Sequence, residues 1–360
     1  MRLVGGPGGG GPLVRLVMSV AMTALLASVL PACRAGRSVA AGSGATSTTS
    51  ADSAVVTPSS AGGASRYQQA VDAAAARGLK VWLEADLAKR WLAGPDQFHQ
   101  GIVALGQLAS RPGVVGIKLA DELGYHYGLG DDVNRMLKFL TDTRSALSQA
   151  APGKQLLVDF VIPDLGCAPG MSGGGPAGCV AKWDGEYPAL ALGQLDRVFG
   201  SGTIDVADIS TGLETDATYS AWGIDRDRAQ TAAWAEIRRR GWDRQVRLQA
   251  RKALAHPGAY SGGSAQAVAD ARTFIDIPVA SGAKAVDIWA WRELYQGQTV
   301  RLMDPQLVSN PLWVALQQRH AAGDTLFTHF TPSQVDKGVG PDLDQLAQVF
   351  SSVYVAAGIG

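Results

Sequence analysis

Residues 80–122 read KVWLEADLAKRWLAGPDQFHQGIVALGQLASRPGVVGIKLADE, and this stretch decides the fold. It begins and ends with short apolar runs rich in β-branched residues, 80–85 and 114–119, which we expect to be strands. Between them, residues 96–110 have the apolar spacing of an amphipathic helix. A strand, a helix and a second strand of these lengths form a βαβ unit, in which the two strands are parallel.

The same alternation continues along the chain and predicts an α/β fold, a (β/α)8 TIM-type barrel whose first or last strand is irregular. We expect strands at 53–57, 80–85, 114–119, 156–161, 204–209, 246–250, 285–291 and 325–330. We expect helices at 66–77, 96–110, 132–149, 187–199, 226–240, 265–281, 311–321 and 342–356. A doubly wound open sheet is the alternative, but its usual glycine-rich phosphate turn after an early strand is missing from the sequence.

The N-terminus has the features of an export signal. Arg2 and Arg15 form a positive region without acids, and residues 16–30 are uncharged and mostly apolar. That run suits a signal peptide and is short for a membrane-spanning helix. The residues Leu30-Pro31-Ala32-Cys33 resemble the bacterial lipobox, which implies removal of residues 1–32 and a lipid on Cys33. The alternative is a secreted protein cut near Ala32, with no lipid.

Residues 33–52 are rich in Ser, Thr, Gly and Ala, which predicts a flexible tether between the lipid and a barrel domain at 53–360. The location we expect is the cell surface, anchored to the cytoplasmic membrane. Lys plus Arg and Asp plus Glu both number 32, so no charge excess indicates a nucleic-acid partner. We expect a monomer.

Cys167 and Cys179 both lie in the glycine- and proline-rich stretch GCAPGMSGGGPAGC at 166–179. Two nearby cysteines in an exported protein favour a disulfide. A two-thiolate metal site is the alternative, but no histidine lies close by in the sequence. We expect neither a metal nor a cofactor.

Strand side chains alternate, so one set faces the helices and the other faces the barrel interior. Placing Val81, Leu83 and Ala85 toward the helices turns charged and aromatic residues inward. The same parity on the other strands predicts a polar interior. Its inward residues include Trp82, Glu84, Asp86, Lys118, Glu122, Asp159, Arg247, Gln249, Arg251, Asp287, Trp289, Trp291 and Glu293. For Lys118, Arg247, Glu84, Asp159 and Asp287, structural ion pairs low in the barrel are an open alternative to a functional role.

Glu122 and Glu293 follow strands whose parity aims both carboxylates at the carboxyl-terminal mouth, where barrel active sites lie. Paired carboxylates cleave glycosidic bonds, one as acid and one as nucleophile or base, and aromatic rings stack on sugars. We therefore predict Glu122 and Glu293 as catalytic. The predicted substrate-binding residues are Trp82, Glu84, Asp86, Asp121, Tyr125, Asp159, Gln249, Arg251, Trp289 and Trp291.

Two segments, GIKLADE at 116–122 and VDIWAWRE at 286–293, make the chain resemble the glycoside hydrolase barrel superfamily with two catalytic glutamates. In that group the acid follows an asparagine at strand 4 and the nucleophile ends strand 7. Here Glu122 follows Asp121 and ends the third expected strand, while Glu293 ends the seventh. The resemblance implies an enzyme that cleaves extracellular or cell-wall carbohydrate. A non-catalytic carbohydrate-binding lipoprotein and a structural surface lipoprotein are the alternatives.

Overall fold

The computed structural model describes residues 65–126, 128–249 and 254–358, and for Leu248 and Gln249 it describes the backbone only. The strands are β1 Lys80–Glu84, β2 Val114–Lys118, β3 Gln155–Val161, β4 Val206–Ser210, β5 Val246–Gln249, β6 His256–Pro257, β7 Val286–Tyr295, β8 Gln298–Arg301, β9 Leu326–Phe330 and β10 Ser352–Ala356. The α-helices are α1 Arg66–Ala75, α2 Leu87–Ala93, α3 Pro95–Ala109, α4 Val133–Ala150, α5 Gly174–Glu186, α6 Leu192–Phe199, α7 Asp216–Ala221, α8 Arg226–Arg239, α9 Ser264–Ala271, α10 Ile277–Ala280, α11 Pro311–Ala321 and α12 Val339–Leu346. Short single turns lie between them, including η1 Pro163–Leu165.

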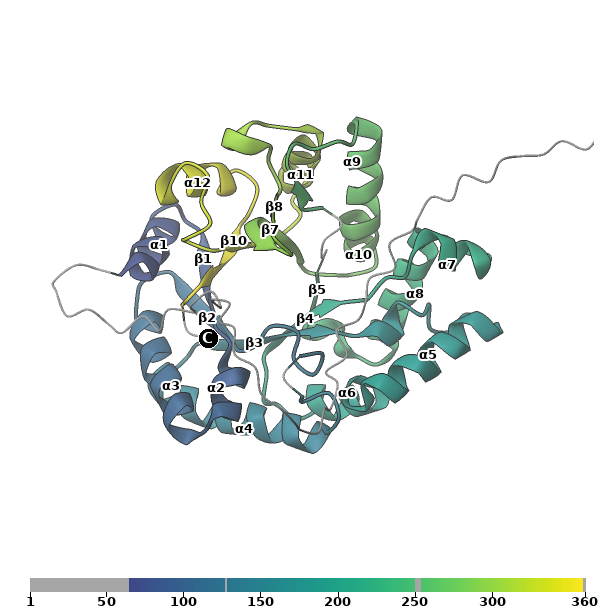
Figure 1. Cartoon of the computed structure of the whole chain (residues 1–360), viewed down its shortest axis with the longest axis horizontal. Coiled ribbons are helices and arrows are strands. Elements are labelled where there is room, and N and C mark those ends of the chain that lie inside the picture. The colour runs from purple at the N-terminus through teal and green to yellow at the C-terminus, as the bar shows by residue number, and fades with distance from the viewer. Residues whose placement is uncertain (1–64, 127, 250–253, 359–360) are drawn as a thin grey trace, which may run out of the picture. The chain divides into compact units, whose positions relative to one another are not determined.

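These strands form one curled, mostly parallel sheet with helices outside it (Figure 1). Parallel pairings run from β1 through β2, β3, β4, β5, β7 and β9 to β10, and β10 pairs again with β1. The two further strands are antiparallel, with β8 on β7 and β6 on β8. The carboxyl ends of the parallel strands therefore meet at one edge, which we call the mouth.

The alternation predicted for the strands is confirmed in β1. Val81 and Leu83 belong to the main core cluster beneath the helices, whereas Trp82 belongs to a second cluster on the inner face. We call this second cluster the apolar layer. Its buried members are Trp82, Leu157, Val206, Ala285, Phe327 and Tyr354. Gly116 makes room for it, because a Cβ at Gly116 would lie 2.2 Å from the Trp82 ring.

The helix predicted at 342–356 is wrong in its second half. Helix α12 ends at Leu346, and residues Ser352–Ala356 form β10 between β1 and β9. Tyr354 lies in the apolar layer while Val353 and Val355 pack in the main core, so the segment alternates as a strand does. The strand predicted at 53–57 lies outside the described residues.

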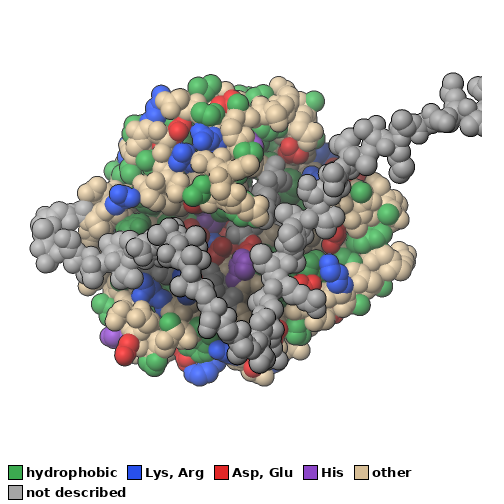
Figure 2. Space-filling model, viewed as in Figure 1, with side chains coloured by type: hydrophobic (Ala, Val, Ile, Leu, Met, Phe, Trp, Pro, Cys, Tyr) green, Lys and Arg blue, Asp and Glu red, His purple; other side chains and the backbone are tan. Residues whose placement is uncertain are grey.

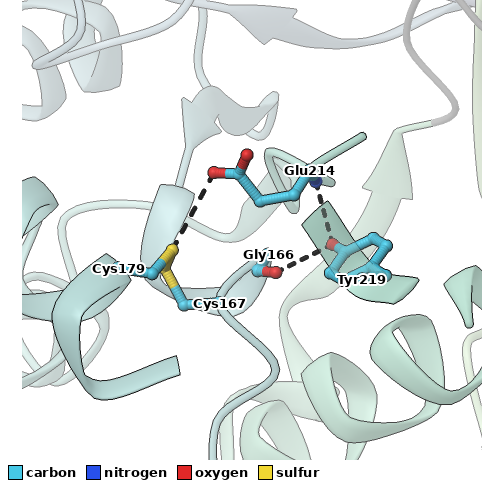
Figure 3. Close-up of a disulfide and its surroundings, with 5 residues drawn as sticks. All are labelled: Gly166, Cys167, Cys179, Glu214 and Tyr219. Atoms are coloured by element: carbon cyan, nitrogen blue, oxygen red, sulfur yellow. Dashed lines mark hydrogen bonds between the residues drawn. A yellow bond between two sulfur atoms is a disulfide. The ribbon is translucent and has the colours of Figure 1, made fainter. Parts of the chain in front are cut away.

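Helix α5 begins within the glycine-rich stretch that contains Cys167 and Cys179. The predicted disulfide is confirmed: Cys167 and Cys179 are bonded, with 5.6 Å between their Cα atoms. Around it, the Tyr219 hydroxyl donates to Gly166 O at 2.8 Å, and Glu214 Oε1 lies 3.8 Å from Cys179 Sγ (Figure 3). The bond fastens α5, whose buried residue is Pro176, to the chain that leaves β3.

Within the described ranges, no helix is both long and apolar enough to cross a membrane. The apolar run at 16–30 lies outside those ranges.

Candidate active site

A layer of charged side chains lies on the inner face of the sheet toward the mouth. We call it the charged layer, and its members are Glu84, Lys118, Asp159, Asp208, Asp287 and His329. Asp, Glu and His side chains are visible together in the central hollow of the molecule (Figure 2). Charges this numerous are costly to remove from water unless they pair. The pairings therefore show how the layer is built.

Lys118 holds three carboxylates at once. Its fully buried ammonium donates to Glu84 Oε1 at 2.6 Å and to Asp121 Oδ1 at 3.0 Å, and lies 3.5 Å from Asp159 Oδ2. Burial opposes the charge on Lys118, but the attraction of these carboxylates outweighs it and raises the pKa well above its usual value. The ammonium is therefore a fixed cation and cannot act as a nucleophile.

His329 bridges two further carboxylates. Its Nδ1 lies 3.0 Å from Glu84 Oε2 and its Nε2 lies 2.8 Å from Asp287 Oδ2, so both ring nitrogens face acceptors. Burial disfavours the imidazolium, but Asp287 and Glu84 outweigh that effect and raise the pKa of His329 to about 10. Burial likewise opposes ionisation of Glu84, yet His329 and Lys118 lower its pKa to about 2. Glu84 is thus an ionised carboxylate whose side chain is 22% exposed.

Deeper acids in the layer have the opposite tendency. Burial raises the pKa of Asp159 well above its usual value, and Asp121 adds to the effect while Lys118 opposes it. Burial and the nearby Asp287 raise the pKa of Asp208 to about 7. Tyr354 donates to Asp208 Oδ2 at 2.7 Å, which connects the charged layer to the apolar layer.

Glu293 lies where β7 leaves the sheet and pairs with β8. Thr331, just beyond β9, donates to Glu293 Oε2 at 2.6 Å, and the amide of Leu294 donates to Oε1 at 3.1 Å. Burial raises the pKa of Glu293 more than these hydrogen bonds lower it, and the negative charge of Glu84 raises it further. The Glu293 carboxyl therefore holds a proton more readily than Glu84 does.

Glu122 occupies a tight turn after β2, with a φ of 47°. Its carboxylate lies 3.0 Å from Nδ1 of His126, and the next amide, Leu123 N–H, donates to Asp159 O at 2.8 Å. The Glu122 side chain is 12% exposed, so it is mostly buried. His126 itself is exposed.

Three of the predicted substrate-binding residues make contacts within the protein. Trp82 faces inward as expected, but it is 2% exposed and lies in the apolar layer, below the charges. Asp86 caps α2 by accepting from Lys89 N–H. Tyr125 stacks on Tyr187, with 4.7 Å between ring centroids.

The two tryptophans of β7 lie in different environments. Trp289 is half-buried and meets Tyr295 edge-on, with 5.4 Å between ring centroids. Trp291 is 3% exposed and packs against Trp313 of α11 in the main core, so its predicted inward direction is wrong. The physical reason is an irregularity of the β7–β9 pairing between Ile288 and Arg292, which breaks the two-residue alternation. We therefore omit Trp291 from the site.

For two further predicted site residues, Gln249 and Arg251, the structure describes no side chain. Gln249 pairs through its backbone with Asp287, but its side chain is not described. Arg251 lies outside the described residues.

Part of the set for which ion pairs were the alternative does form ion pairs. Lys118 pairs with Glu84 and Asp159, as that alternative expected. Arg247 instead places its guanidinium over the rings of Phe327 and Trp82, at 4.2 Å and 4.8 Å from their centroids. Among the described residues, no group of three or more His, Cys, Asp or Glu side chains could hold a metal ion.

Sequence reasoning missed two polar residues of β9 and its end, His329 and Thr331. The segment THFT at 328–331 did signal them, because alternation places His329 and Thr331 on the face opposite the buried Phe330.

Comparison with known proteins adds little. The chain matches no protein-family model and no curated protein. Among solved structures it is similar to a GH18 chitinase from Pseudoalteromonas aurantia, with 14% identity, a TM-score of 0.40 and coverage of 77% of this chain and 93% of that one. It is also similar to a β-1,4-D-mannanase from Cryptopygus antarcticus, with 8% identity, a TM-score of 0.39 and coverage of 77% and 83%. A pyruvate carboxylase from Rhizobium etli has 12% identity and a TM-score of 0.36 over 80% of this chain, which spans 24% of that enzyme. Similarities this weak carry no functional argument.

Proposed function

We propose that the protein is a glycoside hydrolase-like enzyme with a (β/α)8 barrel fold that cleaves extracellular or cell-wall carbohydrate. The observation that carries the proposal is the contrast between carboxyl groups near the mouth. The pKa of Glu293 is raised by burial, whereas that of Glu84 is lowered to about 2 by His329 and Lys118, which outweigh the effect of burial. Carboxyl groups whose environments push their pKa values apart are what acid-assisted cleavage of a glycosidic bond requires.

In this mechanism Glu293 is the acid that protonates the leaving oxygen, and a second carboxylate at the mouth acts on the anomeric carbon. Glu122 is the partner that the sequence predicts, and its side chain is 12% exposed after β2. The half-buried ring of Trp289 and the stacked rings of Tyr125 and Tyr187 supply aromatic surface for sugar rings.

The cellular location is part of the proposal. An exported protein anchored through Cys33 would meet polymeric sugars outside the cytoplasmic membrane, and a secreted form without the lipid is the alternative. The disulfide between Cys167 and Cys179 supports export, since such bonds persist in oxidising compartments.

The test is hydrolysis of a broad panel of polysaccharides and 4-nitrophenyl glycosides by the full chain. Glu293→Gln should lower kcat/KM by roughly 100- to 10,000-fold, because it removes the proton that the leaving oxygen needs. Wild-type kcat/KM should fall as pH rises through the raised pKa of Glu293, because the acid works only in its protonated form.

A matched control is Asp96→Asn, which alters an exposed carboxylate in the first turn of α3 and should leave the rate unchanged. If the Glu293→Gln variant turned over substrate at the wild-type rate, Glu293 would be excluded as the acid. Glycan binding without turnover across the panel would instead indicate a non-catalytic carbohydrate-binding protein.

A further inference from the structure

The end of β9 brings the Glu84 and Glu293 carboxyl groups together. His329 binds Glu84 at 3.0 Å, and Thr331 binds Glu293 at 2.6 Å. These two residues are two positions apart, and extended chain spans about 7 Å over that distance. Phe330 between them is buried in the main core, so His329 and Thr331 share the inner face. The Glu84 and Glu293 carboxyl groups are therefore both bound by side chains of one short segment on the inner face, and cleavage of a glycosidic bond needs such a pair of carboxyl groups.

The strand between Glu84 and His329 carries a small residue at this level. Glu84 is on β1 and His329 is on β9, and β10 lies between the two strands. The β10 residue opposite Glu84 is Ala356, whose side chain is a single methyl group. The Glu84 carboxylate can therefore cross β10 to reach His329 and still retain an exposed face.

We propose that Glu84, rather than Glu122, is the carboxylate that attacks the anomeric carbon, with Glu293 as the acid. Lys118, His329 and Asp287 are positioning residues that hold Glu84 in place and ionised. This inference rests on the proposed function and refines it, because it names the second reacting group. It also implies retention of configuration, because attack by Glu84 on C1 and then by water gives two successive inversions.

The reaction then proceeds in two steps. In the first, the Glu293 carboxyl gives its proton to the glycosidic oxygen, the bond from C1 to that oxygen breaks with its electron pair going to the oxygen, and a Glu84 oxygen bonds to C1. In the second, water attacks C1 and loses a proton to the Glu293 carboxylate, and the bond between C1 and Glu84 breaks with its electron pair returning to Glu84. The net result is hydrolysis with retained configuration.

Glu122 has a different environment. It contacts the imidazole of His126, which is 47% exposed, whereas Glu84 is bound by two cations that are nearly or fully buried. A hydrogen-bonded cation in a buried site fixes a carboxylate more firmly than a solvated one does. The two glutamates can therefore be told apart by substitution.

The first experiment needs no substrate. In the full chain labelled with 13C at the glutamate carboxyl groups, the Glu293 resonance is assigned from its loss in Glu293→Gln and then titrated. Glu84→Gln should lower the Glu293 midpoint, because it removes a neighbouring negative charge. Asp121→Asn is the matched control, since Asp121 binds the same Lys118 but is 41% exposed, and it should shift the midpoint less. If the titration midpoint of Glu293 is the same in Glu84→Gln as in the wild type, the pairing of Glu84 with Glu293 is overturned, whether or not any glycoside is cleaved.

The second experiment uses 2,4-dinitrophenyl glycosides that the wild-type chain hydrolyses. Glu84→Ala should lower kcat at least about 100-fold, and sodium azide should restore release of dinitrophenol with formation of a glycosyl azide of inverted configuration. Glu84→Asp retains the charge but withdraws it by one methylene group, so it should fold and still lose about 100-fold in kcat.

Each outcome of this experiment decides a different point. Full activity in Glu84→Asp, or azide rescue of Glu122→Ala in place of Glu84→Ala, overturns the assignment while the proposed hydrolase activity remains. If the wild-type chain cleaves no glycoside, the proposed function is overturned, and the catalytic role of Glu84 with it. The titration then tests only whether Glu84 and Glu293 are neighbours.

Discussion

Lys118 is a single buried side chain on which three carboxylates depend. Lys118→Met would remove the ammonium and leave Glu84, Asp121 and Asp159 facing one another without it. Because a buried charge without its partner is costly, we expect a loss of about 3–5 kcal/mol in the free energy of unfolding. Urea denaturation followed by tryptophan fluorescence measures it.

Lys138→Met provides the control for this loss. Lys138 also forms an ion pair, 2.8 Å from Asp142, but its side chain is 66% exposed and its partner is four residues along α4. Exposed pairs of this kind contribute less than about 1 kcal/mol. Equal losses in the two variants would show that the charged layer contributes no more than a surface ion pair.

The residues of the candidate site were predictable to different degrees. Glu84, Lys118 and Asp159 followed from two-residue alternation, which holds wherever a strand is regular. The position of Trp291 did not follow from alternation, because the β7–β9 pairing changes register between Ile288 and Arg292. No local sequence pattern indicates that change. The contacts of Lys118 could not be predicted from the sequence either, since they depend on which strands are neighbours in the sheet.

At the scale of single elements, helix α5 is held to the protein by few contacts. Its buried residue is Pro176, the disulfide anchors Cys179, and near its C-terminal end Trp183 and Tyr187 stack at 6.1 Å. The double variant Cys167→Ser/Cys179→Ser should therefore loosen the first half of α5. By the chain-entropy model, closing a loop of this length contributes about 3 kcal/mol. Amide hydrogen exchange should rise at least about tenfold in residues 174–182, measured by mass spectrometry.

Helix α4 is the internal control for that measurement. It buries six residues, including Phe139 and Leu140, and it contains neither of the two cysteines. Its exchange should be unchanged in the double variant. Equal acceleration of α4 and α5 would mean that the disulfide stabilises the whole fold, and unchanged α5 would mean that other contacts hold it.

The last strand shows what element-level patterns leave undecided. The segment SVYVA at 352–356 alternates in burial, yet the apolar residues from Leu343 to Val355 also suit a continuous helix. Local periodicity favours neither interpretation over so short a run. The deciding factor is non-local: β1 and β9 each have an edge that β10 pairs with. Most of the other strands were predictable because a helix separates each from the next.

At the scale of the whole molecule, the curled sheet contains two chemically different layers. The apolar layer supplies hydrophobic packing, and the charged layer above it places ionised groups near the mouth. Tyr354 belongs to both, because its ring stacks on Phe327 while its hydroxyl binds Asp208. The strand that carries Tyr354 therefore connects the hydrophobic interior to the candidate site.

This position of β10 predicts that the fold depends on the last residues of the chain. A chain that stops after Phe350 would leave the facing edges of β1 and β9 unpaired and remove Val353, Tyr354 and Val355, all fully buried. Unpaired backbone groups and lost apolar burial act together, so we expect loss of cooperative unfolding, measured by thermal denaturation with circular dichroism. A chain that stops after Gly358 keeps β10 and should unfold as the full chain does. Cooperative unfolding of the shorter chain near the full-length Tm would show that β1 and β9 do not need β10 between them.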